Sequence, residues 1–447
     1  MPYCQRVTSH RAVAKLQALV RIPTVSYPDW STVDADAFDA FVAELAAQFP
    51  VLHARLELTR VDTHGLLFHW RGRSADRPVV LMAHSDVVPV DADAVWQHPA
   101  FGAEIHDGAI WGRGTLDDKG AIAAICEAVE TLLEQDFVPA QDIWLSIGCN
   151  EEVSGGAAAL AVEHLDRNGV RPWFVLDEGG AIAAGAFPGV EPPVGVVGVT
   201  EKGVTSIELR VDGRGGHAST PARNAPSVRL AHALRRLDRR QMPASVPEPT
   251  VELLRRLAPH APARLRPMMA NAGRLRPLLT RVLIAAGPEP AAMTRTTFAI
   301  TTLSGSPALN VICSTAKAGV NIRIMVGDTV ATVLEHVRRA IDDDQVQVIV
   351  VEENEAAPVS PMDEAFELIE ATISAVFPDA VPAPYVMMAG TDSRFFTRLC
   401  TRVYRFTPFR MTKEQRESIH TYDEHLGVDD FIDGVHWYQR LIERIPE

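Results

Sequence analysis

Ionisable residues follow several short apolar runs in this sequence, and their types suit metal chemistry. One histidine–aspartate pair and three carboxylate pairs share this setting: His84 and Asp86, Asp117 and Asp118, Glu151 and Glu152, and Asp177 and Glu178. Residues two apart on an extended chain point to the same side of it. Adjacent carboxylates repel each other, so such pairs are costly unless cations or protons compensate them.

Two of the pairs also have a purely structural interpretation. His84 and Asp86 could simply end a buried strand. Asp117 and Asp118 lie in a Gly-rich turn just before a predicted helix, where aspartate caps the helix and offsets its dipole. Capping requires one aspartate, however, and this turn carries two.

Alternating strands and helices must position these pairs. Apolar runs over 78–84, 142–148 and 172–179 predict buried strands, and 120–135 has helical spacing. This rhythm predicts an α/β fold with a parallel sheet covered by helices. Because ligands bind outside the carboxyl ends of strands in such sheets, we expect the four pairs on one rim.

The pattern changes near Gly198, where strands with one exposed face are predicted. Strands over 203–217, 317–327 and 346–353, with a helix over 329–342 and another after Pro226, suit a small α+β domain. We therefore predict an inserted domain over 200–357 and a main domain in two segments, 1–199 and 358–447.

Residues 235–297 form an Arg- and Pro-rich excursion within the predicted inserted domain. Eleven arginines but only three acidic residues occur over 235–281. The simpler interpretation is a helical surface segment with solvated arginines. The alternative is a docking surface or a wall of a substrate-access route.

Overall charge and cysteine content restrict partners and location. The chain has 43 basic and 57 acidic residues, a net charge of −14, which disfavours nucleic acid or an anionic membrane as partner. Five scattered cysteines form no CxxC pair, and the start lacks an apolar signal region. These features predict reduced thiols and a cytoplasmic location.

Carboxylates converging on imidazole require positive charge, which divalent metal ions supply. Imidazole and carboxylate ligands without thiolate suit Zn, Mn or Co. Because there are more than four candidate ligands, we expect two ions about 3.5–4 Å apart that share a bridging carboxylate.

Eight motifs along the chain resemble a known enzyme family. They are "AHSDVVPV", "GRGTLDDKG", "NEEVSGG", "LDEGG", "GRGGHASTP", "LNVI", "GTDSR" and "IHTYDEH". Together they resemble the dinuclear zinc amidohydrolases that include aminoacylase, carboxypeptidase S, glutamate carboxypeptidase and succinyl-diaminopimelate desuccinylase. The nearest resemblance is to carboxypeptidase S and hydrolases of N-fatty-acyl amino acids. It implies a zinc-peptidase-type mixed sheet flanked by helices, with a smaller inserted lid domain that often dimerises.

The resemblance assigns roles at the metal centre. It implies that Asp117 bridges the ions and that a cis peptide bond follows it. Asp86 would orient the ring of a ligand histidine, and Glu151 would be the general base. The implied metal ligands are His84, Asp117, Glu152, Asp177 and His420.

Substrate contacts are implied in the lid and near the C-terminal segment. His217, reaching the site often from a partner subunit, would polarise the scissile carbonyl. Asn310 and Arg323 would face the substrate, with Arg323 holding a free carboxylate; a strand-surface salt bridge is the alternative for Arg323. Gly390 and Thr391 would line the pocket.

These features together predict a metal-dependent hydrolase of an amide or peptide bond next to a free carboxylate. A small peptide or an N-acyl amino acid would be the substrate, as for a carboxypeptidase, dipeptidase or N-acyl-amino-acid hydrolase. The alternative is a non-catalytic metal-binding scaffold on the same fold. The adjacent Glu151 and Glu152, base and ligand, favour the enzyme.

Overall fold

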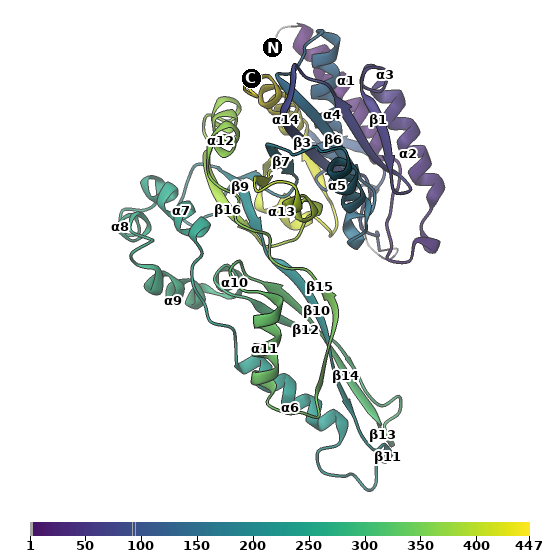
Figure 1. Cartoon of the computed structure of the whole chain (residues 1–447), viewed down its shortest axis with the longest axis vertical. Helices are drawn as coiled ribbons and strands as arrows, with labels where there is room; N and C mark the ends of the chain where they lie inside the picture. The colour runs from purple at the N-terminus through teal and green to yellow at the C-terminus, as the bar shows by residue number, and fades with distance from the viewer. Residues whose placement is uncertain (1–2, 92, 94) are drawn as a thin grey trace.

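The computed structural model describes residues 3–91, 93 and 95–447. Figure 1 shows a main body that contains both ends of the chain and a lid that extends away from it. Each body has a sheet and hydrophobic clusters of its own.

A mixed sheet forms the centre of the main body, and its middle strands are parallel. β3 (Ser74–His84) lies between β6 (Gln141–Gly148) and β7 (Phe174–Asp177), parallel to both. These are the three buried strands that the apolar runs predict. Along the sheet, the order is β1 (Glu57–Val61), β2 (Gly65–Trp70), β6, β3, β7, β17 (Val403–Arg405), β9 (Val194–Glu201), β8 (Ala181–Ala183) and β18 (Arg410–Met411), and β16 (Val381–Met387) pairs with β9.

Helices cover both faces of this sheet because β3 is apolar on both. Val79 and Leu81 belong to a cluster with α1 (Tyr3–Val20), α4 (Lys119–Glu134) and α14 (Val428–Glu443). Val80 and Met82 point to the opposite face, where they join α5 (Ala157–Arg167). Further helices of this body are α2 (Ala35–Gln48), α3 (Pro50–Arg55), α12 (Glu364–Val376) and α13 (Lys413–Ser418).

A small antiparallel sheet joins the two chain segments of the main body. Its order is β19 (His425–Gly427), β5 (Ala109–Trp111) and β4 (Glu104–His106). β5 therefore pairs with a strand contributed by the C-terminal segment. This pairing fixes the C-terminal segment beside the turn that precedes α4.

The lid is an antiparallel sheet with helices on one face only. Its order is β12 (Thr297–Ser304), β14 (Thr315–Ile324), β10 (Gly203–Asp212) and β15 (Gln347–Glu353), and α6 (Pro226–Arg239) and α11 (Val330–Ile341) cover one face. Sequence periodicity missed β12, because this edge strand is exposed along most of its length and does not alternate. The predicted domain boundaries stay predictions. The chain passes from the main sheet to the lid sheet between β9, which ends at Glu201, and β10, which begins at Gly203.

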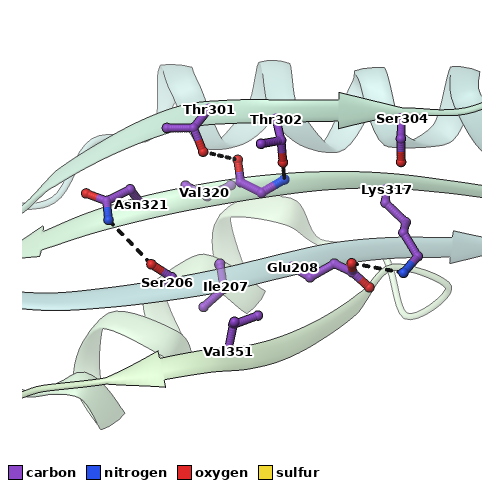
Figure 2. A pocket seen from close by; sticks show the side chains of 11 residues that line it. Ser206, Ile207, Glu208, Thr301, Thr302, Ser304, Lys317, Val320, Asn321 and Val351 are labelled. Carbon is purple, nitrogen blue, oxygen red and sulfur yellow. Dashed lines mark hydrogen bonds and ion pairs between the residues drawn. The ribbon is translucent and has the colours of Figure 1, made fainter. Parts of the chain in front are cut away.

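The open face of the lid sheet is polar and slightly hollowed. A hollow of about 260 Å³ lies on this face. Lys317 and Glu208, which both line it, form an ion pair at 3.0 Å (Figure 2). Nearby, the side-chain amide of Asn321 donates to the hydroxyl of Ser206 at 3.4 Å. These polar pairs explain how the face stays exposed to solvent.

The Arg- and Pro-rich excursion is helical, as predicted. It contains α7 (Glu248–Leu257), α8 (Arg266–Ala270), α9 (Arg276–Ala286) and α10 (Pro288–Ala292). α7 buries Leu253 and Leu257 in a cluster that includes Ala383 of β16. Some arginines are paired rather than solvated: Arg256 contacts Glu252 and Glu370.

Candidate metal centre

Three neighbouring strands deliver the predicted ligands to one rim of the main sheet. β3 ends at His84, β7 ends at Asp177, and β6 leads into a short 3-10 turn over Glu151–Val153. Asp117 arrives from the turn before α4, and the C-terminal segment adds His420 after α13.

Asp117 lies between two imidazoles, one at each carboxylate oxygen. The Nε2 atom of His84 is 2.8 Å from Oδ1, and the Nε2 atom of His420 is 2.9 Å from Oδ2. His420 is also 3.0 Å from Glu152. The peptide bond between Asp117 and Asp118 is cis, as the resemblance implied. With this placement, each carboxylate oxygen of Asp117 can bind a different cation.

The carboxylate of Asp86 orients the backbone of the glutamate pair. It accepts hydrogen bonds from the backbone N–H groups of Glu151 and Glu152, at 3.1 and 3.2 Å, and from the hydroxyl of Ser26 at 2.7 Å. The ring of His84 meets the main-chain carbonyl of Asp86 at 3.0 Å and its carboxylate at 3.4 Å. With Nδ1–H donated to that carbonyl, Nε2 keeps its lone pair for a metal.

Asp177 is buried at the same rim but outside the tightest group. Its carboxylate accepts a hydrogen bond from the backbone N–H of Ser393 at 2.9 Å. His84, Asp117 and Glu152 offer ligand atoms that all lie within 4.8 Å of one another. The structure thus brings four predicted ligands into direct contact and places the fifth beside them.

The donor set fits divalent metal ions. Among the described residues, no hydrogen-bond donor reaches the buried atoms Asp118 Oδ1, Glu152 Oε1 or either carboxylate oxygen of Asp392. Burial raises the pKa of Glu152, of Asp177 and of Asp392, the last to about 7. Hydrogen bonds to Asp117 and Glu152 raise the pKa of His420 to about 10. The positive charge of protonated imidazole thus offsets the negative charge of the buried carboxylates. Bound divalent ions would supply that positive charge instead.

Glu151 faces a largely apolar pocket next to these ligands. Burial, reinforced by the neighbouring carboxylates of Asp392 and Asp117, raises its pKa well above the ordinary value. The pocket has a volume of about 460 Å³. Its apolar lining includes Ala181, Ala183, Ala186, Phe187, Val196, Met293, Met387, Met411 and Ile419. Met293 belongs to the Arg- and Pro-rich excursion, which therefore forms part of the pocket wall.

Two buried acidic residues of the centre were not assigned roles from the sequence. Glu424 accepts hydrogen bonds from the guanidinium of Arg113 at 2.6 Å and from the backbone N–H groups of Gly114, Leu116 and Asp117. Asp392 approaches Gly148 at the end of β6. Both lie within recognised motifs, "IHTYDEH" and "GTDSR", but spacing alone did not separate them from their neighbours.

The predicted substrate residues fall into two groups. Gly390 lines the pocket, and buried Thr391 is hydrogen-bonded to Glu201. Arg323 is half-buried at the base of the lid, where burial of Lys202 and, to a smaller extent, the charge of Arg323 lower the pKa of Lys202.

The other two predicted substrate residues lie at the far tip of the lid. His217 on β11 (Gly216–His217) and Asn310, which precedes β13 (Val311–Ile312), are exposed. Figure 1 shows both strands at the end of the lid that points away from the main body. Within one chain, His217 and Asn310 therefore do not reach the pocket.

The rim of imidazoles and carboxylates, with a glutamate facing a pocket, defines a metal-dependent hydrolase. A family model described as Peptidase family M20/M25/M40 matches residues 80–444. The chain belongs to this family, and it hydrolyses amide or peptide bonds in a metal-dependent reaction. The alternative of a non-catalytic scaffold is therefore set aside.

Individual relatives cover nearly all of the chain. The probable carboxypeptidase S-like 2 of Dictyostelium discoideum is 35% identical, covering 92% of this chain and 81% of its own. The human N-fatty-acyl-amino acid synthase/hydrolase PM20D1 is 34% identical, covering 96% and 86%. A solved M20 family metallo-carboxypeptidase from Sulfolobus solfataricus has a TM-score of 0.71 at 15% identity, covering 97% and 98%. The solved structure supports the fold alone.

In the described part of the chain, the helices are too short or too polar to cross a membrane.

Proposed function

We propose that this enzyme hydrolyses N-acyl amino acids with an apolar acyl group, cleaving the amide next to the free carboxylate. The observation that carries the proposal is the pocket of about 460 Å³. It begins at Asp117, Glu151 and His420 and continues over methionine, phenylalanine and aliphatic side chains. Such a lining favours an apolar acyl group over a charged peptide side chain.

We further propose two divalent ions per chain, with zinc as the first choice and Co or Mn as alternatives. His84, Asp117, Glu152, Asp177 and His420 would hold them, with Asp117 between the two positions. When bound, the ions lower the pKa of water from 15.7 towards about 7 and polarise the substrate carbonyl.

Glu151 is the proposed general base and then the general acid. Its raised pKa and its place on the pocket wall suit a carboxylate that accepts a proton from water. It then delivers this proton to the leaving amine nitrogen. Asp86 keeps the backbone of Glu151 and Glu152 in place through its two accepted hydrogen bonds.

The amino-acid part of the substrate would lie towards the base of the lid. Arg323 would hold the free carboxylate there, beside Gly390 and Thr391. His217 and Asn310 would come from the lid tip of a second copy in a homodimer, since neither reaches the pocket of its own chain.

Hydrolysis of a matched substrate panel tests the proposal. The panel contains N-acyl phenylalanines with acyl chains of increasing length, and dipeptides with the same C-terminal residue. We expect kcat/KM to rise with acyl length and to fall for dipeptides, and a chelator to abolish both activities. Equal or better hydrolysis of dipeptides would overturn the substrate class while leaving the metal-dependent reaction intact.

A second variant links the preference to the pocket. Met293→Lys would place a charge in the apolar wall, so we expect kcat/KM for long acyl chains to fall more than for the acetyl substrate. Arg274→Lys, an exposed change in the same excursion, is the matched control. An unchanged chain-length profile in Met293→Lys would exclude this wall as the acyl site.

A further inference from the structure

A second group of potential metal ligands lies outside the dinuclear centre, on the small sheet. Glu104 and His106 are two residues apart on β4, so both side chains point to the same side of the strand. His98 comes from the loop that precedes β4. These three residues share no member with the catalytic ligands.

The donor atoms already have the spacing of a metal site. Nδ1 of His98 is 3.3 Å from Oε2 of Glu104, and Nε2 of His106 is 3.0 Å from the same oxygen. All three donor atoms lie within 4.8 Å of one another. In a tetrahedral zinc site with bonds of about 2.0–2.1 Å, ligand atoms are about 3.3–3.4 Å apart. A cation could therefore enter with only small shifts of the side chains.

Neighbouring aromatic rings hold the two imidazoles in place. The rings of His98 and His106 are stacked with centroids 3.8 Å apart. Trp111 lies 4.8 Å from His98 and stacks on His425 at 4.2 Å. The indole N–H of Trp111 also donates to the main-chain carbonyl of His106 at 3.2 Å. Such support reduces the cost of ordering the ligands around an ion.

Charge and access also suit a cation. Hydrogen bonding to His106 lowers the pKa of Glu104, so its carboxylate is ionised at neutral pH. The exposed fraction is 22% for the side chain of His98 and 45% for those of Glu104 and His106. An ion can therefore reach the group directly from solution.

We propose that His98, Glu104 and His106 bind a single divalent transition-metal ion, such as Zn²⁺ or Cu²⁺, separately from the catalytic centre. Two imidazoles and one carboxylate leave a coordination position open for water. The ion would connect the loop carrying His98 to β4.

The neighbouring contacts relate this site to the catalytic segment. Gln97, next to His98, donates hydrogen bonds from its backbone and side-chain amides to the carboxylate of Asp423, at 2.7 and 2.9 Å. Asp423 lies between His420 and Glu424 in the sequence. A bound ion would therefore hold in place the loop whose Gln97 contacts Asp423.

Metal counting on the intact enzyme tests the proposal. Full-length protein is loaded with zinc, dialysed against low micromolar Zn²⁺ and analysed for ions per chain. We expect one ion more in the wild type than in His106→Gln or Glu104→Gln, with binding of that ion weakened at least about 10–100-fold. Hydrolytic activity should stay at the wild-type level in both variants. His260→Gln, an exposed histidine in the excursion, is the matched control.

Spectroscopy identifies the ligands independently. One equivalent of Cu²⁺ added to the zinc-loaded enzyme should give an electron paramagnetic resonance spectrum with hyperfine coupling to two imidazole nitrogens. His106→Gln should reduce this to one, with catalytic zinc retained in the same sample. The proposal is overturned if the wild type binds no additional ion, or if both variants bind it with unchanged affinity and spectrum.

Discussion

Asp117 is the residue whose carboxylate connects the two histidines of the catalytic centre. One oxygen meets His84 and the other meets His420, from opposite ends of the sequence. Burial of Asp117 raises its pKa, but hydrogen bonds from the two imidazoles outweigh this and lower it overall. Asp117 therefore stays ionised and available to cations on both sides.

Replacing Glu151 by glutamine should separate metal binding from catalysis. Glutamine keeps the size of the side chain but cannot accept a proton from water. We expect kcat to fall by about 10²–10⁴-fold, with metal content unchanged by elemental analysis. Glu163→Gln, an exposed glutamate on α5, is the control. Wild-type turnover in Glu151→Gln would show that another group is the base.

The buried ion pair between Arg113 and Glu424 should be a large contributor to stability. Glu424→Gln leaves a fully buried guanidinium without its counter-charge, which costs about 3–5 kcal/mol. The free energy of unfolding from denaturant titration measures this. Lys413→Ala, in an exposed pair with Glu417, should cost at most about 1 kcal/mol. Similar losses in the two variants would contradict the assignment.

Residue types predicted that these side chains meet at one rim, but their role as ligands stays a prediction, and the sequence could not show which atoms contact one another. His84, Asp117, Glu152 and His420 do meet, because strand ends and motif order limit where they can lie. The sequence could not show that the carboxylate of Asp86 accepts hydrogen bonds from backbone N–H groups and lies farther from the ring of His84. That depends on the fold of the turn after β6, as the role of Glu424 depends on a long-range contact.

At the level of elements, Lys202 stands at the joint between β9 of the main sheet and β10 of the lid. Its ammonium group is buried and donates to the main-chain carbonyls of Ala292 and Arg295, both at 2.9 Å. Burial, with the nearby charge of Arg323, lowers the pKa of Lys202 to about 8. The joint therefore contains a group that titrates at mildly alkaline pH.

Stability should rise as pH increases from about 8 to about 10.5. In this window the unfolded chain keeps the Lys202 proton, whereas the folded chain has released it. Since stability rises with pH wherever the unfolded state binds more protons, the gain is at most about 3 kcal/mol.

Unfolding curves of wild type and Lys202→Met across this window measure the effect. The difference between them should grow in favour of the wild type as pH rises. Lys413→Met, at an exposed position, is the control. A pH-independent difference would show that Lys202 keeps an ordinary pKa in the folded protein.

Elements with strong periodicity could be predicted, and those without it could not. The parallel strands β3, β6 and β7 are buried on both faces and appear as apolar runs. β12 is exposed, and β16 contains two prolines. β12 was missed because it does not alternate, and β16 because its place depends on β9, a partner strand that is distant in the sequence.

For the whole molecule, the distance between the lid tip and the pocket is the feature that bears on assembly. If His217 acts in a second copy, two inactive variants should complement each other. Mixed His217→Ala and Glu151→Gln chains would form sites with Glu151 from the first and His217 from the second. We expect activity to reappear after mixing and refolding together, measured against each variant alone.

The same mixture can contradict the proposed dimer. A lack of activity, with sedimentation showing that mixed dimers form, would mean that His217 acts within its own chain or not at all. A monomer in solution that is fully active would exclude the proposal directly.

The predicted cytoplasmic location stays a prediction. Cys126, Cys149, Cys313 and Cys400 are buried free cysteines in the structure. The side chain of Cys4 lies outside the described residues.

The residues of the candidate metal centre lie on both sides of the lid in the sequence, so they are synthesised at different times. His84, Asp117 and Glu152 leave the ribosome well before His420 and Glu424 do. At about 5–20 residues per second, the early ligands wait roughly ten seconds to a minute for the last one. If these residues hold the metal ions, capture is complete only once His420 has left the ribosome, and a nascent chain that stops before His420 carries no complete site.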